Sequence, residues 1–150
     1  MSVVDVYPVR RAGHGFELLV LRRAAGGRCA GSWESVHGHI EPGERPVEAA
    51  LRELLEETGL QPEALYNLSR VESFYQHRID EVALVPVFVA MIGAAAVAQP
   101  GGEHDATEWL ALADARARLA WPRERRALED LELLLVGGHA GPLEDVLRVC

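Results

Sequence analysis

The chain has 150 residues, of which 49% are hydrophobic and 25% are charged, as in ordinary globular proteins rather than disordered ones. Its formal net charge of -8 argues against non-specific binding to nucleic acids, and its apolar runs are too short to span a membrane. The two cysteines, Cys29 and Cys150, suggest neither a disulfide framework nor a zinc site. We therefore expect a single domain over residues 1–150. Because no signal peptide precedes the first predicted strand, we expect a cytoplasmic protein.

Strand-like and helix-like segments alternate along the chain. Runs rich in β-branched and aromatic residues predict strands at 3–9, 16–21, 32–36, 69–76 and 81–92. Pro86 in the last of these implies an edge position or a bulge. Helical spacing of apolar residues predicts helices at 46–58, 112–119 and 123–136. Loops are expected at 24–31, 61–68 and 93–102, with a hairpin turn at 77–80 and no assignable pattern at 143–150. This order favours an α/β fold, a mixed sheet with helices on both faces.

The helix predicted at 46–58 carries an acidic face. Glu53, Glu56 and Glu57 stand at positions i, i+3 and i+4, so they share one side of the helix, away from its apolar stripe. Gly59 is typical of a helix end. Two interpretations follow. The face is either simply solvated, or it binds a hard divalent cation such as Mg²⁺ or Mn²⁺, which prefers carboxylate oxygens.

The wider spacing around these glutamates is specific. It reads Gly38, five residues, Glu44, seven residues, Arg52-Glu53, an aliphatic, any residue, Glu56-Glu57, any residue, Gly59 and an aliphatic. The pattern resembles the Nudix box, and every constrained position matches. The resemblance implies the Nudix α/β/α sandwich, with a mixed sheet between helices. It also implies metal-assisted attack of water on a phosphoanhydride, in a substrate that links a nucleoside diphosphate to another group.

The resemblance also implies roles for the residues of the box. Glu53, Glu56 and Glu57, with the Gly38 carbonyl, would hold Mg²⁺ or Mn²⁺, and one glutamate would accept a proton from the attacking water. Which glutamate acts as the base differs among Nudix branches and stays open. Arg52 would orient Glu53 through a charge-assisted contact, and Glu44 would support the site from outside the metal ligands.

Residues outside the box extend the predicted site. Arg22 and Arg23 follow the strand at 16–21 and are either a solvated strand end or a contact for substrate phosphate. Glu103 precedes His104 and the strand containing Trp109, a context that recurs in several Nudix branches. There the resemblance implies that Glu103 is a further metal ligand or base on a loop; the alternative is an ordinary exposed side chain.

The substrate branch is suggested by a departure from the commonest Nudix pattern. Where many members carry Leu-Pro-Gly-Gly, this chain has Ser35-Val36-His37-Gly38. Together with Glu103-His104 and Trp121, this looks most like the branch that cleaves dihydroneopterin triphosphate. A second nucleoside would need another platform, for which Tyr75 with Arg78 is the nearest candidate pair.

The resulting functional prediction is a metal-dependent pyrophosphohydrolase. It would cleave a nucleoside triphosphate or related triphosphate to a monophosphate and pyrophosphate. The alternatives are a dinucleoside polyphosphate hydrolase and a catalytically silent nucleotide-binding Nudix module. The expected partner is a small nucleotide or related diphosphate-containing molecule, and neither a membrane nor a nucleic acid. The oligomeric state is left open, with a homodimer among the alternatives.

Overall fold

The computed structural model describes residues 2–13 and 15–150 of the chain. Within these residues a mixed sheet is built from β1 (Val3–Ala12), β2 (Gly15–Arg23), β3 (Trp33–Glu34), β4 (Val36–His39), β5 (Ala64–Gln76), β6 (Glu81–Met91) and β7 (His104–Ala111). The strand order is β3-β2-β1-β6-β5, while β4 pairs with β1 and β7 pairs with β2. β1 and β6 run parallel, and the other pairs are antiparallel.

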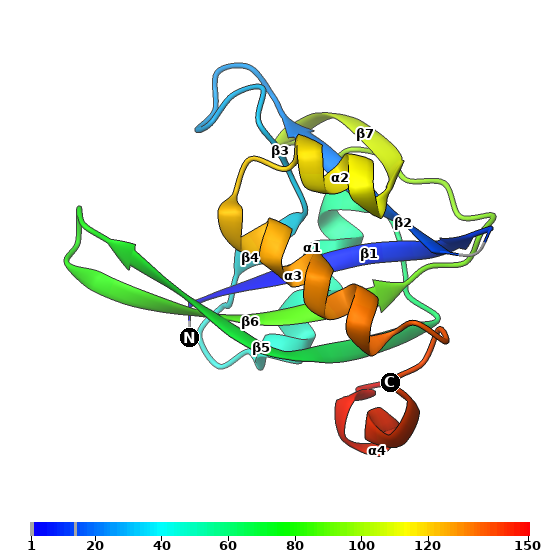
Figure 1. Cartoon of the computed structure of the whole chain (residues 1–150). Helices are drawn as coiled ribbons and strands as arrows, with labels where there is room; N and C mark the ends of the chain where they lie inside the picture. The colour runs from blue at the N-terminus through cyan, green and yellow to red at the C-terminus, as the bar shows by residue number, and fades with distance from the viewer. Residues whose placement is uncertain (1, 14) are drawn as a thin grey trace.

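Helices cover both faces of this sheet (Figure 1). They are α1 (Pro46–Thr58), α2 (Leu112–Arg118), α3 (Pro122–Leu134) and α4 (Glu144–Leu147), and a 3₁₀ turn, η1, spans Gly141–Leu143. Strand side chains alternate between two cores, so Leu18 of β2 packs with the α2 and α3 side and Leu19 with the α1 side. The expected α/β sandwich is therefore confirmed. Among the described residues, none of the helices combines the length and apolar character needed to cross a bilayer.

Most predicted elements are confirmed, and the main error lies at 61–68. That segment was expected as a loop, but β5 already begins at Ala64 and continues across a register shift between Asn67 and Val71. Ser69 adopts a φ of 55°, and its N–H donates to the Asn67 side chain, which is a turn-like feature inside a strand. Of the two positions predicted for Pro86, the edge is wrong, because β6 lies between β1 and β5. The bulge agrees with the structure, because Pro86 pairs with Val71 directly beyond this irregularity.

The last residues, which carried no assignable pattern, form η1 and α4. They then return to the sheet, where Arg148 makes an isolated bridge with Tyr66.

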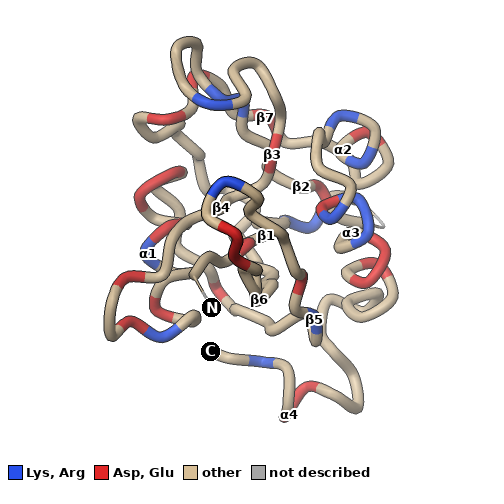
Figure 2. The backbone as a smooth tube through the Cα atoms, turned by 90° about the vertical axis from the view of Figure 1, so that its left-hand side faces the viewer, with Lys and Arg blue, Asp and Glu red and all other residues tan. Residues whose placement is uncertain are grey.

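The C-terminal end of α1 holds the loop that leads into β7. Gly59 ends the helix with a φ of 70°, and its N–H donates to the Leu55 carbonyl at 2.8 Å. The loop then docks on the same helix end, with Gly101 N–H donating to the Glu57 carbonyl at 2.8 Å. This docking brings the segment before β7 beside the acidic face of α1. Figure 2 shows acidic segments, in red, repeated along α1 and the turn before it.

Candidate active site

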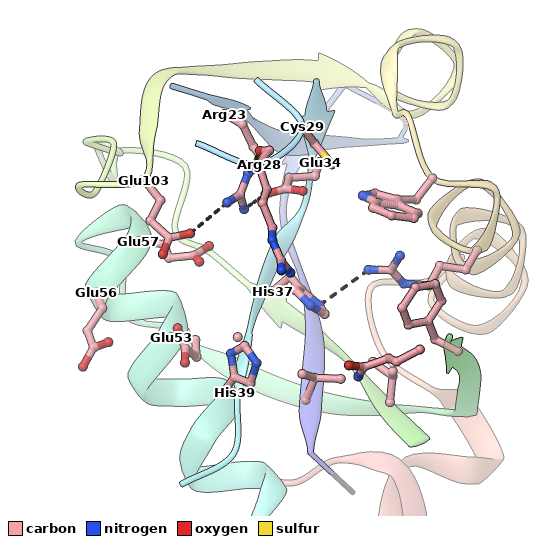
Figure 3. A pocket seen from close by; sticks show the side chains of 17 residues that line it. Arg23, Arg28, Cys29, Glu34, His37, His39, Glu53, Glu56, Glu57 and Glu103 are labelled. Carbon is pink, nitrogen blue, oxygen red and sulfur yellow. Dashed lines mark hydrogen bonds and ion pairs between the residues drawn. The ribbon is translucent and has the colours of Figure 1, made fainter. Parts of the chain in front are cut away.

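A cavity of about 620 Å³ opens between α1, β4, the loop before β7 and the start of α3. Its two ends differ in chemistry. Glu53, Glu56, Glu57 and Glu103 line one end, as Figure 3 shows. Phe74, Trp121 and Arg123 line the other, with His37 also facing the cavity. The structure therefore places the glutamates predicted from the box in one cavity with Glu103, although they come from distant segments.

Gly38 is required by the close approach of β4 to α1. A Cβ atom built on Gly38 would lie 1.8 Å from the Glu53 carboxyl carbon, so no larger residue fits there without moving Glu53. The glycine thus sets its own backbone against a carboxylate that lines the cavity. This close approach places the β4 backbone at Gly38 directly against the Glu53 carboxylate.

Arg52 fixes the geometry of this end of the cavity. Its Nη1 donates to Glu53 Oε1 at 2.8 Å, and its Nη2 donates to the His39 carbonyl at 2.8 Å. Both oxygens of Glu44 accept hydrogen bonds from the same guanidinium, each at 2.9 Å. These hydrogen bonds from Arg52, together with one from the Glu41 N–H, lower the pKa of Glu44 to about 2. Arg52 therefore ties Glu53 to β4 and to the turn before α1.

The carboxylate of Glu57 is largely buried and lies near other negative charges. Burial, followed by the charges of Glu53 and Glu34, raises its pKa to about 9. Its Oε2 atom is buried and finds no hydrogen-bond partner within the described part of the chain. A buried oxygen of this kind is costly unless a proton or a cation compensates it. The carboxylate oxygens of Glu53, Glu56 and Glu57, which line the same cavity, are of the kind that suits a hard divalent cation.

The acidic side chains that line the cavity do not converge on one point in this structure. Within residues 2–13 and 15–150, no three side chains from His, Cys, Asp and Glu lie close enough to enclose a metal ion. Three of these carboxylates contact arginines instead, since Arg52 Nη1 also lies 3.3 Å from Glu56 Oε2. Arg52 binds Glu53, and Arg23 Nη2 binds Glu103 Oε2 at 3.1 Å.

The two arginines predicted as phosphate contacts lie in different surroundings. Arg23 lines the cavity, and its Nη1 is paired at 2.9 Å with Glu34, a buried carboxylate that His104 also contacts at 3.0 Å. Arg22 is paired with Asp105 at 2.7 Å and does not line the cavity. Arg28, which the sequence did not single out, does line it.

The aromatic side chains near the site divide between the hydrophobic core, the surface and the cavity. Trp33 packs against the hydrophobic cluster on the α3 side and does not line the cavity. Tyr75 is exposed and donates to Asp80 at 2.8 Å, away from the cavity lining. Phe74 and Trp121 face the cavity instead, with ring centroids 6.2 Å apart in an edge-to-face arrangement.

Sequence reasoning missed the buried acids behind the cavity. Asp5, Glu34 and Glu124 are almost fully buried, and each contacts groups far away in sequence. One signal was available, since Asp5 interrupts an otherwise apolar strand and a charge there needs a partner. The sequence could not name that partner.

Comparisons with known proteins bear on the family of this chain. The sequence model of the NUDIX domain matches residues 1–131. The chain is 33% identical over 136 residues to an octanoyltransferase of Myxococcus xanthus, covering 86% of this chain and 36% of that protein. It is 26% identical over 144 residues to a Caenorhabditis elegans protein named as a nudix hydrolase, covering 94% and 37%. The chain thus spans little more than a third of the length of these curated relatives.

Solved structures show the same fold. An Ap4A hydrolase of Caenorhabditis elegans superposes with a TM-score of 0.74 at 23% identity, over 90% of this chain and 97% of that one. The dihydroneopterin triphosphate pyrophosphohydrolase of Escherichia coli superposes with a TM-score of 0.70 at 23% identity, over 87% and 94%. With the sequence match over most of the chain and the complete box on α1, this protein belongs to the NUDIX domain family.

Proposed function

We propose that this chain is a metal-dependent pyrophosphohydrolase of the acid-anhydride class. It cleaves a phosphoanhydride bond in a nucleoside triphosphate or related triphosphate and releases a monophosphate and pyrophosphate. The observation that carries the proposal is the unpartnered, buried Oε2 of Glu57, which lies in a cavity also lined by Glu53, Glu56 and Gly38. Such a group of oxygen donors favours Mg²⁺ or Mn²⁺ together with phosphate oxygens.

Each residue of this site has a distinct task in the proposed reaction. The metal ligands would be Glu53, Glu56 and Glu57 with the Gly38 carbonyl, joined by Glu103. A bound divalent cation would offset phosphate charge and make a water molecule more acidic.

The neighbouring side chains support hydrolysis in other ways. One of the carboxylates accepts the proton that water loses as its oxygen bonds to phosphorus. Arg52, braced by Glu44, holds Glu53 in place. Arg28 lines the cavity and would supply positive charge for the substrate's phosphates. Arg23 also lines it, and would reach a phosphate by exchanging its contact with Glu103. Arg22 lies outside this cavity, so a phosphate contact there would require its release from Asp105.

The dinucleoside polyphosphate alternative has weaker support. The likeness to the Ap4A hydrolase concerns the fold, as its identity of 23% indicates. Two nucleosides would need two platforms, and within the described residues the aromatic side chains lining the cavity are Phe74 and Trp121, which adjoin each other. The silent-module alternative conflicts with the completeness of the box. A homodimer and a cytoplasmic location remain sequence-based predictions.

The decisive experiment is a phosphate-release screen of the purified chain. Nucleoside triphosphates, dihydroneopterin triphosphate and diadenosine tetraphosphate are compared with Mg²⁺ and with Mn²⁺, and products are identified by mass. We expect monophosphate and pyrophosphate from a triphosphate, and no turnover in EDTA. A preference of about a hundredfold in kcat/KM for the dinucleotide, equivalent to about 2.7 kcal/mol, would reverse the ranking. Absence of turnover on every substrate would favour the silent module.

A further inference from the structure

The end of the cavity opposite the glutamates is built around one buried ion pair. Asp5 of β1 is 1% exposed and accepts hydrogen bonds from Arg123 Nε at 2.8 Å and Nη2 at 3.2 Å. It also contacts His37 Nδ1 at 2.6 Å. The guanidinium carbon of Arg123 lies 4.9 Å from the centroid of the Trp121 ring. None of these residues belongs to the box, yet Arg123, His37 and Trp121 all line the cavity.

Asp5 holds the Arg123 guanidinium but uses only some of its N–H donors. A guanidinium has five N–H groups and no acceptor, and Asp5 uses one on Nε and one on Nη2. In the described part of the chain no partner is found for Nη1, and this atom is not among the buried polar atoms that lack one. Nη1 is therefore not buried, and Arg123 is one of the residues that line the cavity. The ion pair and the Trp121 ring hold the guanidinium plane in one orientation.

Asp5 also determines which ring nitrogen of His37 carries a hydrogen. Burial alone would raise the pKa of Asp5, but hydrogen bonds from His37 and Arg123 lower it below its ordinary value. An ionised Asp5 only accepts, so His37 Nδ1 carries the hydrogen and offers no lone pair to Arg123 Nη2, which lies 3.5 Å from it. Because Asp5 balances the Arg123 charge, this end of the cavity suits an uncharged polar group better than another phosphate. Phe74, Val3 and Val85 add apolar surface around it.

We propose that Arg123, positioned by Asp5, selects substrates whose flat heterocycle carries a carbonyl oxygen beside a ring-nitrogen acceptor, as hypoxanthine and guanine do. This inference rests on the proposed function, because it assigns the non-phosphate part of the same substrate. The phosphates occupy the end lined by glutamates and the heterocycle occupies the end lined by Trp121 and Phe74. Arg123 is then a specificity-determining residue, and Asp5 is a positioning residue.

The preference follows from the chemistry of the donor. Asp5 occupies the Nε–Nη2 side of the Arg123 guanidinium, so a ligand would meet its other end, where one hydrogen on Nη1 and the second hydrogen on Nη2 lie side by side. Two adjacent acceptors match that pair of donors, as the O6 and N7 atoms of guanine match an arginine. Adenine offers N7 but places an amino group where the oxygen would be. That group is a donor, and it opposes the N–H groups of Arg123. Adenine recognition would instead use a side chain that both donates and accepts, such as asparagine or glutamine.

The test is a binding measurement that requires no turnover. Inosine monophosphate and adenosine monophosphate are titrated into the full chain by calorimetry in EDTA. We expect the inosine nucleotide to bind at least roughly tenfold more tightly, within the range that a bidentate guanidinium contact provides. The 7-deaza analogue of inosine monophosphate, which lacks the N7 acceptor, should lose most of that advantage. Equal affinity for inosine and adenosine monophosphates would overturn the proposal.

A variant pair assigns the preference to Arg123. Arg123→Lys keeps a positive charge opposite Asp5 but removes the fork, so the two nucleotides should bind alike. Arg126→Lys is the matched control on the same helix, since Arg126 is more than half exposed and contacts Glu72 outside the cavity. A preference that persists in a folded Arg123→Lys variant would refute the assignment. If that variant does not fold, the 7-deaza comparison on the unmodified chain still decides.

Failure of this selectivity can be distinguished from failure of the proposed reaction. A chain that releases no phosphate from any triphosphate, but binds the inosine nucleotide preferentially, refutes the reaction and keeps the selectivity. Turnover of triphosphates without discrimination between oxo and amino purines refutes the selectivity and keeps the reaction.

Discussion

Glu57 combines features that a solvated acidic side chain does not show. Its raised pKa and its unpartnered Oε2 mean that the folded protein holds a carboxylate where a cation or proton is needed. Glu57→Gln preserves the shape and removes the charge. We expect a rate drop of roughly 10³-fold or more, because a metal ligand supplies several kcal/mol of transition-state stabilisation. Steady-state assays at saturating Mg²⁺ measure this effect.

The matched control for that prediction is Glu48→Gln on the same helix. Glu48 pairs with Arg45 on the surface and does not line the cavity. Its substitution should leave the rate within about twofold of the unmodified chain, since a surface ion pair contributes little. Full activity of Glu57→Gln would remove Glu57 from the proposed site.

Glu103 is more exposed than Glu53 and Glu56, the other cavity glutamates that contact arginines. Its side chain is 71% exposed and is held by Arg23. If it joins the metal or accepts the proton only when substrate is bound, Glu103→Gln should lower kcat more than it raises KM. Michaelis curves for both proteins under one metal condition give the comparison. An unchanged kcat would make Glu103 a surface partner of Arg23 and nothing more.

The site depends on how helix α1 ends, because the loop before β7 docks there. Gly59 has a φ of 70°, a conformation that favours glycine, and Gly101 docks on the same helix end. Gly59→Ala should reduce the free energy of unfolding by about 1 kcal/mol, measured by urea denaturation. Gly27→Ala is the control, because Gly27 is not in the left-handed region and has space for a Cβ atom. Equal stability of the two variants would contradict the role of Gly59.

The elements that the sequence predicted are those with local signals. The helix at 46–58 has a proline near its start, a periodic apolar stripe and a terminal glycine, and α1 has those bounds. The start of β5 was missed because Gln61 and Pro62 suggested a loop, whereas tertiary pairing of Ala64 with Met91 extends the strand. Local preference thus predicted α1 well and β5 only in part.

The site residues also divide into those with a local sequence signal and those placed only by tertiary packing. Glu53, Glu56 and Glu57 were predictable because their spacing alone places them on one helical face. The Asp5 and Arg123 pair joins residues 118 apart in the chain, and Glu124 accepts from Ser35 N–H across 89. No local pattern specifies such pairings, since they arise only when α3 packs against the β-sheet. The end of the cavity lined by Trp121 and Arg123 therefore forms only when the whole chain has folded.

The packing of α3 on the sheet makes the stability of the whole molecule depend on pH. Glu124 is 1% exposed, and burial, opposed by the Ser35 hydrogen bond and reinforced by the charge of Asp5, raises its pKa to about 8. The ordinary value in the unfolded chain is near 4.5. Below that value both states are protonated, and the contribution to stability is fully present. As pH rises toward 8 the unfolded state releases its proton first, so stability falls.

Glu124→Gln removes this titration while keeping an oxygen for the Ser35 N–H to donate to. We expect the free energy of unfolding of the unmodified chain to fall by a few kcal/mol between about pH 4.5 and pH 8 relative to the variant, at about 1.4 kcal/mol per unit of pKa shift. Urea denaturation of both proteins at several pH values gives this difference and cancels the titration of groups they share. Parallel pH profiles would show that Glu124 keeps an ordinary pKa and that α3 does not bury it against the sheet in solution. A difference that grows as pH falls would contradict the sign of the shift.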